Sequence, residues 1–587
     1  MTTSSPFRLP RKTPFGIGEN VAEWMTGLSK LDKFYMQRPV GCNTPAFLRY
    51  TLQVLGIDYH IARGSLDSVP QIGPTVVVAN HPLGCVEGVI LAELLLTIRS
   101  DVQILANQYL KTVPELDKLF IGVDVFEGKD AMKSNMKALR DANKHLAQGG
   151  LLLVFPAGEV SQLVDRKQRR VEDKDWSRSV SALIRKNRAT AVPVFINGQN
   201  SQRFYMAGKI HPLLRTLMLG RELLNKNNQP IQLSIGQAIK YKEVTTLNDE
   251  QLVSYLRLNT YLLGHRGDGQ VAANNHPVSQ EPIAQPLDKA ILLRELAMLP
   301  RDAQLLKQAE FSVYCAKASQ IPSLLHEIGR QREINFRAVG EGTGNAIDID
   351  HFDHYYHHLF VWDDEQQCLV GAYRLGLVDE LQAQLGIDGL YSRTLFEYGQ
   401  RFLSQLGQSI EMGRSVITAE YQRSMSALLL LWKGIATFVH QHPQYTHLFG
   451  PVSISNDYSP AARQLLAQSM TLHHYDTANA EYVKPLNPLP EAHLGWNTSM
   501  LTALGDLQLL SRVIARLDEG KSVPVLLRQY LGLNGKLVCF NVDPAFNNAL
   551  DGLIVVDLRD VPEKTLAKYM TVSGAEAYLK HHQALDR

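Results

Sequence analysis

Short apolar runs recur along the first 265 residues, and polar turns and amphipathic stretches lie between them. Runs of four to eight apolar residues bounded by turn residues are typical of buried strands, whereas a period of 3.6 residues is typical of helices. The pattern predicts a helical and irregular lead-in over residues 1–70, strands at 75–80, 103–106, 151–155, 191–196 and 231–235, and helices at 129–148, 176–188 and 249–263. Strands that alternate with helices indicate an α/β domain.

The pattern stops at residues 265–286, which are rich in Gly, Pro, Asn and Gln and offer little to bury. Such a composition is typical of a linker, so we expect domains at residues 1–264 and 287–587. The second domain is predicted to have helices at 287–298, 322–337, 419–440, 460–470 and 505–518, and strands at 311–316, 359–363, 369–376, 409–417, 447–453, 537–542 and 553–558. A polar turn at 364–367 joins two of these strands and favours an antiparallel hairpin within a mixed α/β fold.

Composition limits the functions that the chain can have. A length of 587 residues is too long for one ordinary core, which agrees with two domains. The net charge of +2 gives no case for a nucleic-acid partner. Five cysteines without a C-x-x-C pair indicate a reducing compartment and no zinc site. Four histidines between 351 and 358 lack cysteine partners or a ligand motif, so we expect no bound metal.

The chain has no apolar run of about 18 residues, so we expect no membrane-spanning helix. Residues 15–35 combine Trp24, Met25 and other apolar side chains with Lys30 and Lys33. This pattern suits a helix that lies in a membrane interface, and it suits equally an amphipathic helix packed on its own domain.

The turn after residues 75–80 carries the first candidate chemistry, with His81 and, six positions later, Glu87. A carboxylate beside a histidine fixes its tautomer and stabilises the protonated ring, so the histidine can take a proton from a hydroxyl group. In open α/β sheets, sites form at the carboxyl ends of strands, where this turn and the one after residues 151–155 both lie. A histidine followed by a glutamate is most often ordinary surface chemistry, so the motifs around it must decide.

Three motifs occur in order: Asn-His-Pro-Leu-Gly from Asn80, Phe-Pro-Ala-Gly from Phe155, and Val-Pro-Val at 192–194. Over residues 40–245 this order resembles the lysophospholipid acyltransferase family, the glycerolipid O-acyltransferases. The resemblance implies His81 and Glu87 as catalytic residues. It implies an acyl-acceptor site that includes Asn80, Phe155, Pro156, Gly158 and Glu159.

Two departures from that family are informative. The family spaces its acid five positions after the histidine, where this chain has Val86, and Glu87 follows one position later. Enzymes with phosphate acceptors read Phe-Pro-Glu-Gly-Thr-Arg-Ser, whereas this chain has Ala157, Glu159 and Val160 at the Glu, Thr and Arg positions. Arginine binds phosphate through paired hydrogen bonds, so its loss favours an acceptor without a phosphate monoester.

The second domain holds charged clusters near residues 330–337, 348–353 and 411–415, with Arg374 between the last two. Their order resembles the acyl-homoserine-lactone synthases and, more closely, the ornithine acyl-carrier-protein N-acyltransferases, which share a GNAT-like fold. The resemblance implies that Glu411 is catalytic. It implies substrate-binding roles for Arg332, Asp350, Asp353, Arg374 and Arg414.

This assignment makes chemical sense. An α-amine is mostly protonated near neutral pH and must lose a proton before it attacks a thioester. Glu411 is our candidate to accept that proton, Asp350 and Asp353 would hold the ammonium groups of a basic amino acid, and Arg332 would contact the carrier. The thioester brings its own reactivity, so no protein nucleophile and no bound cofactor is required.

With both resemblances in one chain, the sequence is similar to the bifunctional ornithine lipid synthases. They imply a C-terminal N-acylation of ornithine by a 3-hydroxyacyl group and an N-terminal O-acylation of that hydroxyl. The expected donor is acyl-ACP, with acyl-CoA as the alternative, and the expected place is the cytoplasmic inner face of the cell membrane, as a peripheral protein. Two rivals stay open. One is a phospholipid acyltransferase fused to another amino-acid N-acyltransferase, and the other is a non-catalytic membrane-binding scaffold.

Overall fold

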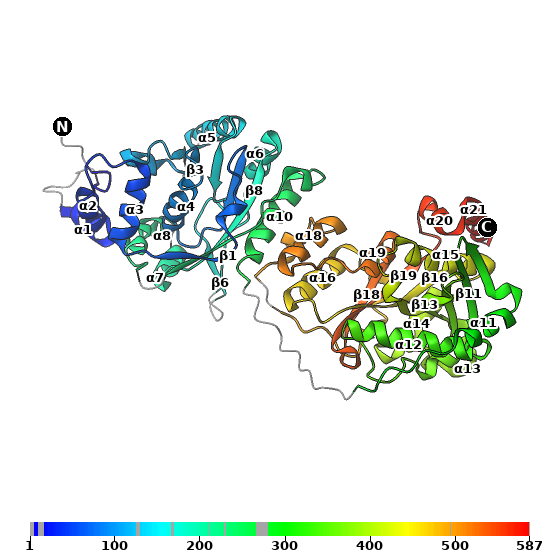
Figure 1. Ribbon diagram of the computed structural model, residues 1–587. Coiled ribbons are helices and arrows are strands. Elements are labelled where there is room, and N and C mark those ends of the chain that lie inside the picture. The colour runs from blue at the N-terminus through cyan, green and yellow to red at the C-terminus, as the bar shows by residue number, and fades with distance from the viewer. Residues whose placement is uncertain are drawn as a thin grey trace. The chain divides into compact units, whose positions relative to one another are not determined.

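The structure is a computed structural model that describes residues 5–9, 17–124, 129–165, 170–210, 212–227, 230–265, 280–492 and 495–585 (Figure 1). The chain forms two compact units. Unit 1 comprises Met1–Arg266 and a later segment, His493–Leu504, while unit 2 comprises Gly267–Ala492 and Gly505–Arg587. The predicted two-domain, mixed α/β organisation is confirmed. The late segment of unit 1 was not predicted, because no local pattern in the sequence marks it. Most of the predicted linker lies outside the described residues.

Unit 1 is built on a seven-stranded sheet with the order β1-β9-β8-β2-β5-β3-β4. In that order the strands are Tyr59–Arg63, Ile231–Ile235, Thr190–Asn197, Thr75–Ala79, Leu151–Val154, Val102–Asn107 and Phe120–Val123. All neighbours are parallel except β8 and β9. The strands β2 and β5 pair in register, with Val78 opposite Val154, so the polar turns that follow them start side by side.

Helices cover both faces of this sheet (Figure 1). Val77 and Ala79 pack with α3 and α4 in one core, and the alternate residues Val76 and Val78 face the opposite layer. The helices on the first face are α3 (Thr44–Leu55) and α4 (Val86–Leu96), and those on the second are α5 (Lys129–Ala147), α6 (Ser179–Asn187) and α10 (Asp249–Leu262). Further elements are α1 (Ile17–Thr26), α2 (Leu28–Met36), α7 (Gln202–Ile210), α8 (Pro212–Leu217), α9 (Leu219–Leu223) and the hairpin of β6 (Gln162–Asp165) and β7 (Arg170–Glu172).

Unit 2 is built on an eight-stranded sheet with the order β10-β11-β12-β13-β15-β16-β19-β18. In that order the strands are Gln304–Gln308, Phe311–Lys317, His357–Asp363, Cys368–Leu377, Ser409–Ile417, His447–Ile454, Ala549–Asp557 and Lys536–Asp543. The predicted antiparallel contribution is confirmed, since only β15 and β16 run parallel. Their ladder ends where Glu411 lies opposite Phe449, and beyond it β15 continues along β13 while β16 continues along β19.

One face of the second sheet packs on α11 (Lys289–Met298) and α12 (Pro322–Ala338), and the other packs on α15 (Met425–Gln441). The sequence predicted α15 from residue 419, but Ala419–Tyr421 form a separate 3-10 turn and Ser424 caps the helix. The other elements of unit 2 are β14 (Phe396–Tyr398), β17 (Val483–Pro485), α13 (Val378–Leu385), α14 (Gln400–Leu406), α16 (Pro460–His473), α17 (Thr477–Ala480), α18 (Leu507–Leu517), α19 (Val525–Gly532), α20 (Glu563–Met570) and α21 (Val572–Leu585).

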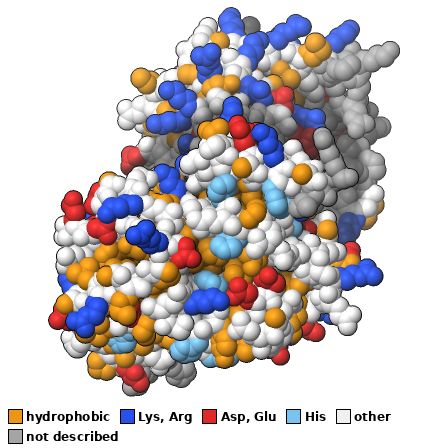
Figure 2. All heavy atoms as spheres, turned by 90° about the vertical axis from the view of Figure 1, so that its right-hand side faces the viewer, with side chains coloured by type: hydrophobic (Ala, Val, Ile, Leu, Met, Phe, Trp, Pro, Cys, Tyr) orange, Lys and Arg blue, Asp and Glu red, His pale blue; other side chains and the backbone are white. Residues whose placement is uncertain are grey.

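Lysine and arginine side chains are interspersed with aspartate and glutamate on the face shown in Figure 2, as the small net charge leads one to expect. Across the described ranges, every helix is either too short or too polar to cross a membrane.

Candidate active sites

The turn after β2 brings His81 and Glu87 together. His81 Nδ1 lies 3.0 Å from Glu87 Oε1, the glutamate is fully buried, and the histidine ring retains some exposure. The same carboxylate oxygen accepts hydrogen bonds of 2.9 Å from the backbone N–H groups of Leu83 and Gly84. Burial by itself would raise the pKa of Glu87, but His81 and the backbone donors outweigh it and lower the pKa below its usual value. The carboxylate therefore stays ionised and orients the imidazole, which leaves Nε2 to take a proton.

Local backbone chemistry explains this arrangement. Helix α4 begins at Val86, so Glu87 lies in its first turn, where a negative charge is favourable. Gly84 has a φ of 100°, a conformation that favours glycine. A Cβ at this glycine would lie 2.5 Å from the end of the Leu219 side chain, so a larger residue would also require this leucine to move.

Asn80 is committed to the sheet. Its amide donates to Ile196 O at 3.0 Å, and its carbonyl oxygen accepts from Ile196 N–H at 2.7 Å. The side chain is buried and ties the end of β2 to β8. Asn80, which the sequence predicts to bind substrate, thus holds the catalytic turn in place.

The acceptor motif lies against the same turn. The rings of Phe155 and His81 have centroids 4.4 Å apart, and Pro156 fixes the segment by accepting from Ser177 N–H at 2.9 Å. Gly158 has a φ of 70° and open space where a Cβ would be. Glu159 forms ion pairs with two cations that the sequence analysis did not single out, Lys174 and Arg215.

Asp173 is a further residue that sequence reasoning missed. Its carboxylate accepts from His81 N–H at 3.1 Å, from Ser161 Oγ at 2.5 Å and from Trp176 Nε1 at 2.9 Å. Ser161 in turn donates its N–H to His81 O at 2.8 Å. Asp173 lies in a charged stretch with no motif of its own, so the sequence carried no signal for this role.

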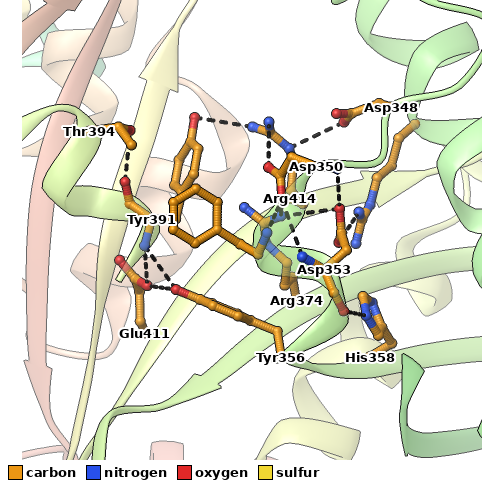
Figure 3. Close-up of polar contacts among 12 residues, drawn as sticks. Asp348, Asp350, Asp353, Tyr356, His358, Arg374, Tyr391, Thr394, Glu411 and Arg414 are labelled. Atoms are coloured by element: carbon orange, nitrogen blue, oxygen red, sulfur yellow. Dashed lines mark hydrogen bonds and ion pairs between the residues drawn. The ribbon is translucent and has the colours of Figure 1, made fainter. Parts of the chain in front are cut away.

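The predicted charged residues of unit 2 meet in one network (Figure 3). Arg332 donates to Asp353 at 2.7 Å, and both side chains are fully buried. Arg374, also fully buried, donates to Asp350 at 2.6 Å and lies 3.3 Å from Asp353. Burial would raise the pKa of Asp353, but the two guanidinium groups lower it far below the usual range. Arg332 therefore supports this network from within instead of contacting a carrier at the surface.

Arg414 joins the network from β15. It lies 3.3 Å from Asp350 and 3.2 Å from Asp348, and it donates to Tyr391 Oη at 3.2 Å (Figure 3). Its φ of 50° is unusual for a non-glycine residue, and it falls where the β13–β15 register shifts. Such a bulge re-aims a side chain, here toward the two aspartates.

Glu411 is buried and surrounded by donors (Figure 3). Its carboxylate accepts from the backbone N–H groups of Tyr391 and Ser392 at 3.1 and 2.7 Å, and from the hydroxyl of Tyr356. These contacts fix the segment that carries Tyr391, which is the partner of Arg414. Neither tyrosine carries a sequence motif, so their part in the site could not be read from the sequence. Among the residues with described positions, no group of three or more His, Cys, Asp or Glu side chains is arranged to hold a metal ion.

Comparisons with known families match both units. A family described as "Acyltransferase" matches residues 29–269, and one described as "Acetyltransferase (GNAT) domain" matches residues 331–433. The chain is therefore an acyltransferase enzyme with one domain of each kind, as its sequence predicts.

Relatives carry the same two kinds of activity in their names. A "Glycine N(alpha)-acyltransferase" from Bacteroides thetaiotaomicron is 30% identical over 275 residues, 44% of this chain and 80% of the relative. One of the same name from Phocaeicola vulgatus is 28% identical over 322 residues, 51% of this chain and 95% of the relative. A "Lyso-glycine lipid O-acyltransferase" from Phocaeicola vulgatus is 26% identical over 197 residues, 32% of this chain and 66% of the relative.

Proposed function

Since this chain belongs to the family of the glycine N(alpha)-acyltransferases, we propose that it builds an amino-acid lipid in two steps. In unit 2 the α-amine of an amino acid attacks the thioester of a 3-hydroxyacyl donor, so that a C–N bond forms, the C–S bond breaks and a thiol leaves. In unit 1 the 3-hydroxyl of that product gives its proton to His81 and attacks a second thioester, so that a C–O bond forms, the C–S bond breaks and the thiol leaves with the proton that His81 returns.

The observation that carries this proposal is the contact between His81 Nδ1 and Glu87 Oε1. It supplies a base oriented for a hydroxyl in a chain that also contains a GNAT domain. In Phocaeicola vulgatus the two named activities belong to two separate proteins, and this chain resembles both. A buried, ionised Glu87 beside His81 is a catalytic arrangement, and a non-catalytic scaffold would not need it.

The amino acid is glycine or ornithine. The sequence predicts ornithine, with Asp350 and Asp353 holding its ammonium groups, but arginines already occupy both carboxylates. Such pairing favours an amino acid without a side-chain cation, in agreement with the relatives' names.

One observation favours a cationic amino acid. Glu341 and Asp551 in unit 2 have pKa values raised to about 7, by burial first and then by the charges of neighbouring carboxylates. The charge of Arg414 lowers the pKa of Asp551, but burial outweighs this effect. An ammonium group would relieve the repulsion between these carboxylates, so ornithine is the second candidate.

The donors and the membrane belong to the same proposal. We expect acyl-ACP as the acyl donor and acyl-CoA as the alternative, because both present a thioester. The lyso-lipid acceptor favours work at a membrane surface. Helix α1 exposes Ile17, Val21, Trp24 and Met25, with Trp24 74% exposed. This exposure suits a helix that lies in a membrane interface. It does not support the alternative that these four side chains pack on their own domain.

Expression of the full chain in a host without amino-acid lipids, followed by lipid mass spectrometry, tests the proposal. We expect a di-acylated lipid whose headgroup mass identifies glycine or ornithine. New phosphatidic acid without an amino-acid lipid would instead support the phospholipid alternative, and no new lipid would support the scaffold.

A further inference from the structure

The acceptor motif of unit 1 lies at the rim of the catalytic turn. Phe155 packs on the His81 ring, and Ser161 N–H donates to His81 O at 2.8 Å. Glu159 lies between these two anchors, so its side chain is held within the span of chain that borders His81. The segment that carries Glu159 is thus anchored to the catalytic turn at both ends.

Two cations from outside the motif converge on Glu159. Lys174 Nζ pairs with Oε1 and Arg215 Nη2 pairs with Oε2. Lys174 directly follows Asp173, whose carboxylate accepts from His81 N–H, and this places the lysine beside the catalytic turn as well. Burial would raise the pKa of Glu159, but the two cations outweigh it and lower the pKa, so the carboxylate stays charged.

Apolar packing fixes the helix that supplies Arg215. Leu219 lies four residues later, at the start of α9, and contacts the position that a Cβ of Gly84 would take. Val160, Phe204 and Leu219 belong to one small apolar cluster between the motif and helices α7–α9. Arg215 is consequently held in place, with 13% of its side chain exposed, whereas Lys174 is 55% exposed.

The cluster has a net charge of +1, since two cations face one carboxylate. Each oxygen of Glu159 takes one nitrogen, and a guanidinium has five N–H donors and an ammonium has three. A substrate carboxylate carries a charge of −1, which this excess balances. A phosphate monoester carries about −1.5 to −2 near neutral pH, which exceeds the single positive charge that Glu159 leaves on the cluster.

We propose that Lys174 and Arg215, held side by side by Glu159, bind the free carboxylate of the acyl acceptor. This inference rests on the proposed O-acylation in unit 1 and names its substrate class, an N-(3-hydroxyacyl) amino acid with an ionised carboxylate. Glu159 then has two roles, because it positions the cations and rejects phosphate headgroups.

Purified full-length protein tests this inference with three acceptors: N-(3-hydroxyacyl)glycine, its methyl ester and a 1-acylglycerol 3-phosphate. The wild type should prefer the free acid to the ester by about tenfold or more in kcat/KM, as a charge-assisted hydrogen bond leads one to expect. Lys174→Gln and Arg215→Gln should raise KM for the acid about tenfold, leave its kcat unchanged and leave the ester unaffected. Glu159→Gln should increase activity with the phosphate acceptor.

The matched control is Lys111→Gln, which removes a lysine of the same unit that pairs with Asp117. It should change none of these values. Equal losses for acid and ester in both cation variants would overturn the subsite, because the cations would then serve only the fold. Equal use of acid and ester by the wild type would overturn it too. Wild type that acylates neither amino-acid acceptor would refute the proposed function itself, and with it this inference.

Discussion

Glu87 Oε1 lies 3.0 Å from His81 Nδ1, although five residues separate the two positions, one more than in the acyltransferases that this turn resembles. Between the two residues, Gly84 adopts a left-handed conformation before α4 begins at Val86. The longer side chain of glutamate then reaches back to the ring from the first turn of the helix. The shifted acid is thus a different route to the same pairing.

Replacing His81 by alanine should stop the second acylation. Loss of a general base typically costs about 10²–10⁴-fold in rate, so a mono-acylated amino-acid lipid should accumulate while N-acylation in unit 2 continues. Lipid mass spectrometry of the expressing host measures both products, with His145→Ala in the same unit as the control. Full di-acylated lipid in the His81 variant would refute the role of the histidine.

The pairing of Glu87 should appear in the pH dependence of stability. The pKa of Glu87 is lower in the folded protein than the value of about 4.3 in unfolded chains, so its contribution is complete above that pH. This contribution should disappear as the pH falls through the folded pKa. The Tm of the wild type should therefore fall more steeply below about pH 4 than that of Glu87→Gln. Parallel Tm curves would show that the carboxylate is not stabilised by His81.

Regular elements could largely be predicted, because their causes are local. Residues 76–79 and 151–154 are continuous apolar runs and form buried central strands. Residues 419–424 are mostly polar, yet the prediction began the helix at residue 419. In the structure Ser424 caps α15, which starts at Met425, a detail that periodicity does not carry. The antiparallel pairing of β8 with β9 depends on the path of the intervening helices, which no local pattern records.

The candidate sites could be predicted in part. His81 and Glu87 are close in sequence, so their pairing is a local property. By contrast, Lys174 and Arg215 reach Glu159 from separate elements, and only the folded chain brings them together. Ion pairs between residues far apart in the sequence could not be predicted either. The sequence places Asp350 near the amino acid but cannot show that Arg374 already occupies it.

Glu411→Gln should collapse N-acylation and leave O-acylation intact. If Glu411 accepts the proton of the amine, the deficit should shrink as the pH rises toward the pKa of the free amino acid's amine, because the deprotonated amine is then already present in solution. If Glu411 only fixes the Tyr391 segment through its backbone hydrogen bonds, the deficit should be independent of pH. Rates of the purified protein between pH 6 and 10 in the wild type and the variant decide between these roles. Glu380→Gln, which alters an exposed pair with Lys317, is the control.

Asp551→Asn should stabilise the protein at pH 8. Burial raises the pKa of Asp551 to about 7 in the folded state, against about 3.9 in unfolded chains, so the folded state holds a proton that the unfolded state has released. The free energy of unfolding therefore falls as the pH rises from about 4 to 7, and the asparagine removes this loss.

Asp557→Asn on the same strand should instead destabilise the protein, because the pairing with His447 and Arg559 lowers the pKa of that carboxyl despite its burial. Thermal unfolding at pH 5 and 8 measures both. Asp551→Asn should raise the Tm more at pH 8 than at pH 5, whereas Asp557→Asn should lower the Tm at both. Equal shifts for Asp551→Asn at the two pH values would contradict the assignment.

The late segment His493–Leu504 should keep the two pieces of a cleaved chain together. This segment belongs to unit 1, although residues on both sides of it belong to unit 2. Met500, Leu501 and Leu504 are buried, and the turn that contains the first two packs on α10. A protease site inserted at residue 272 should allow cleavage, after which the pieces should co-elute in gel filtration and keep both acylations.

A charged residue within the late segment should break the association of the cleaved pieces. Leu501→Asp would bury a charge where a leucine is 1% exposed, and even the milder truncation of a buried leucine to alanine costs about 2–5 kcal/mol. In the cleaved protein this variant should release unit 1 as a separate piece, and Leu486→Asp, at an exposed leucine of unit 2, should not.

Residues 287–587 expressed alone should expose the three apolar side chains of the segment and aggregate more than the same fragment with Met500, Leu501 and Leu504 replaced by serine. Pieces that separate at once on cleavage of the wild type would show that the segment contributes nothing to the association.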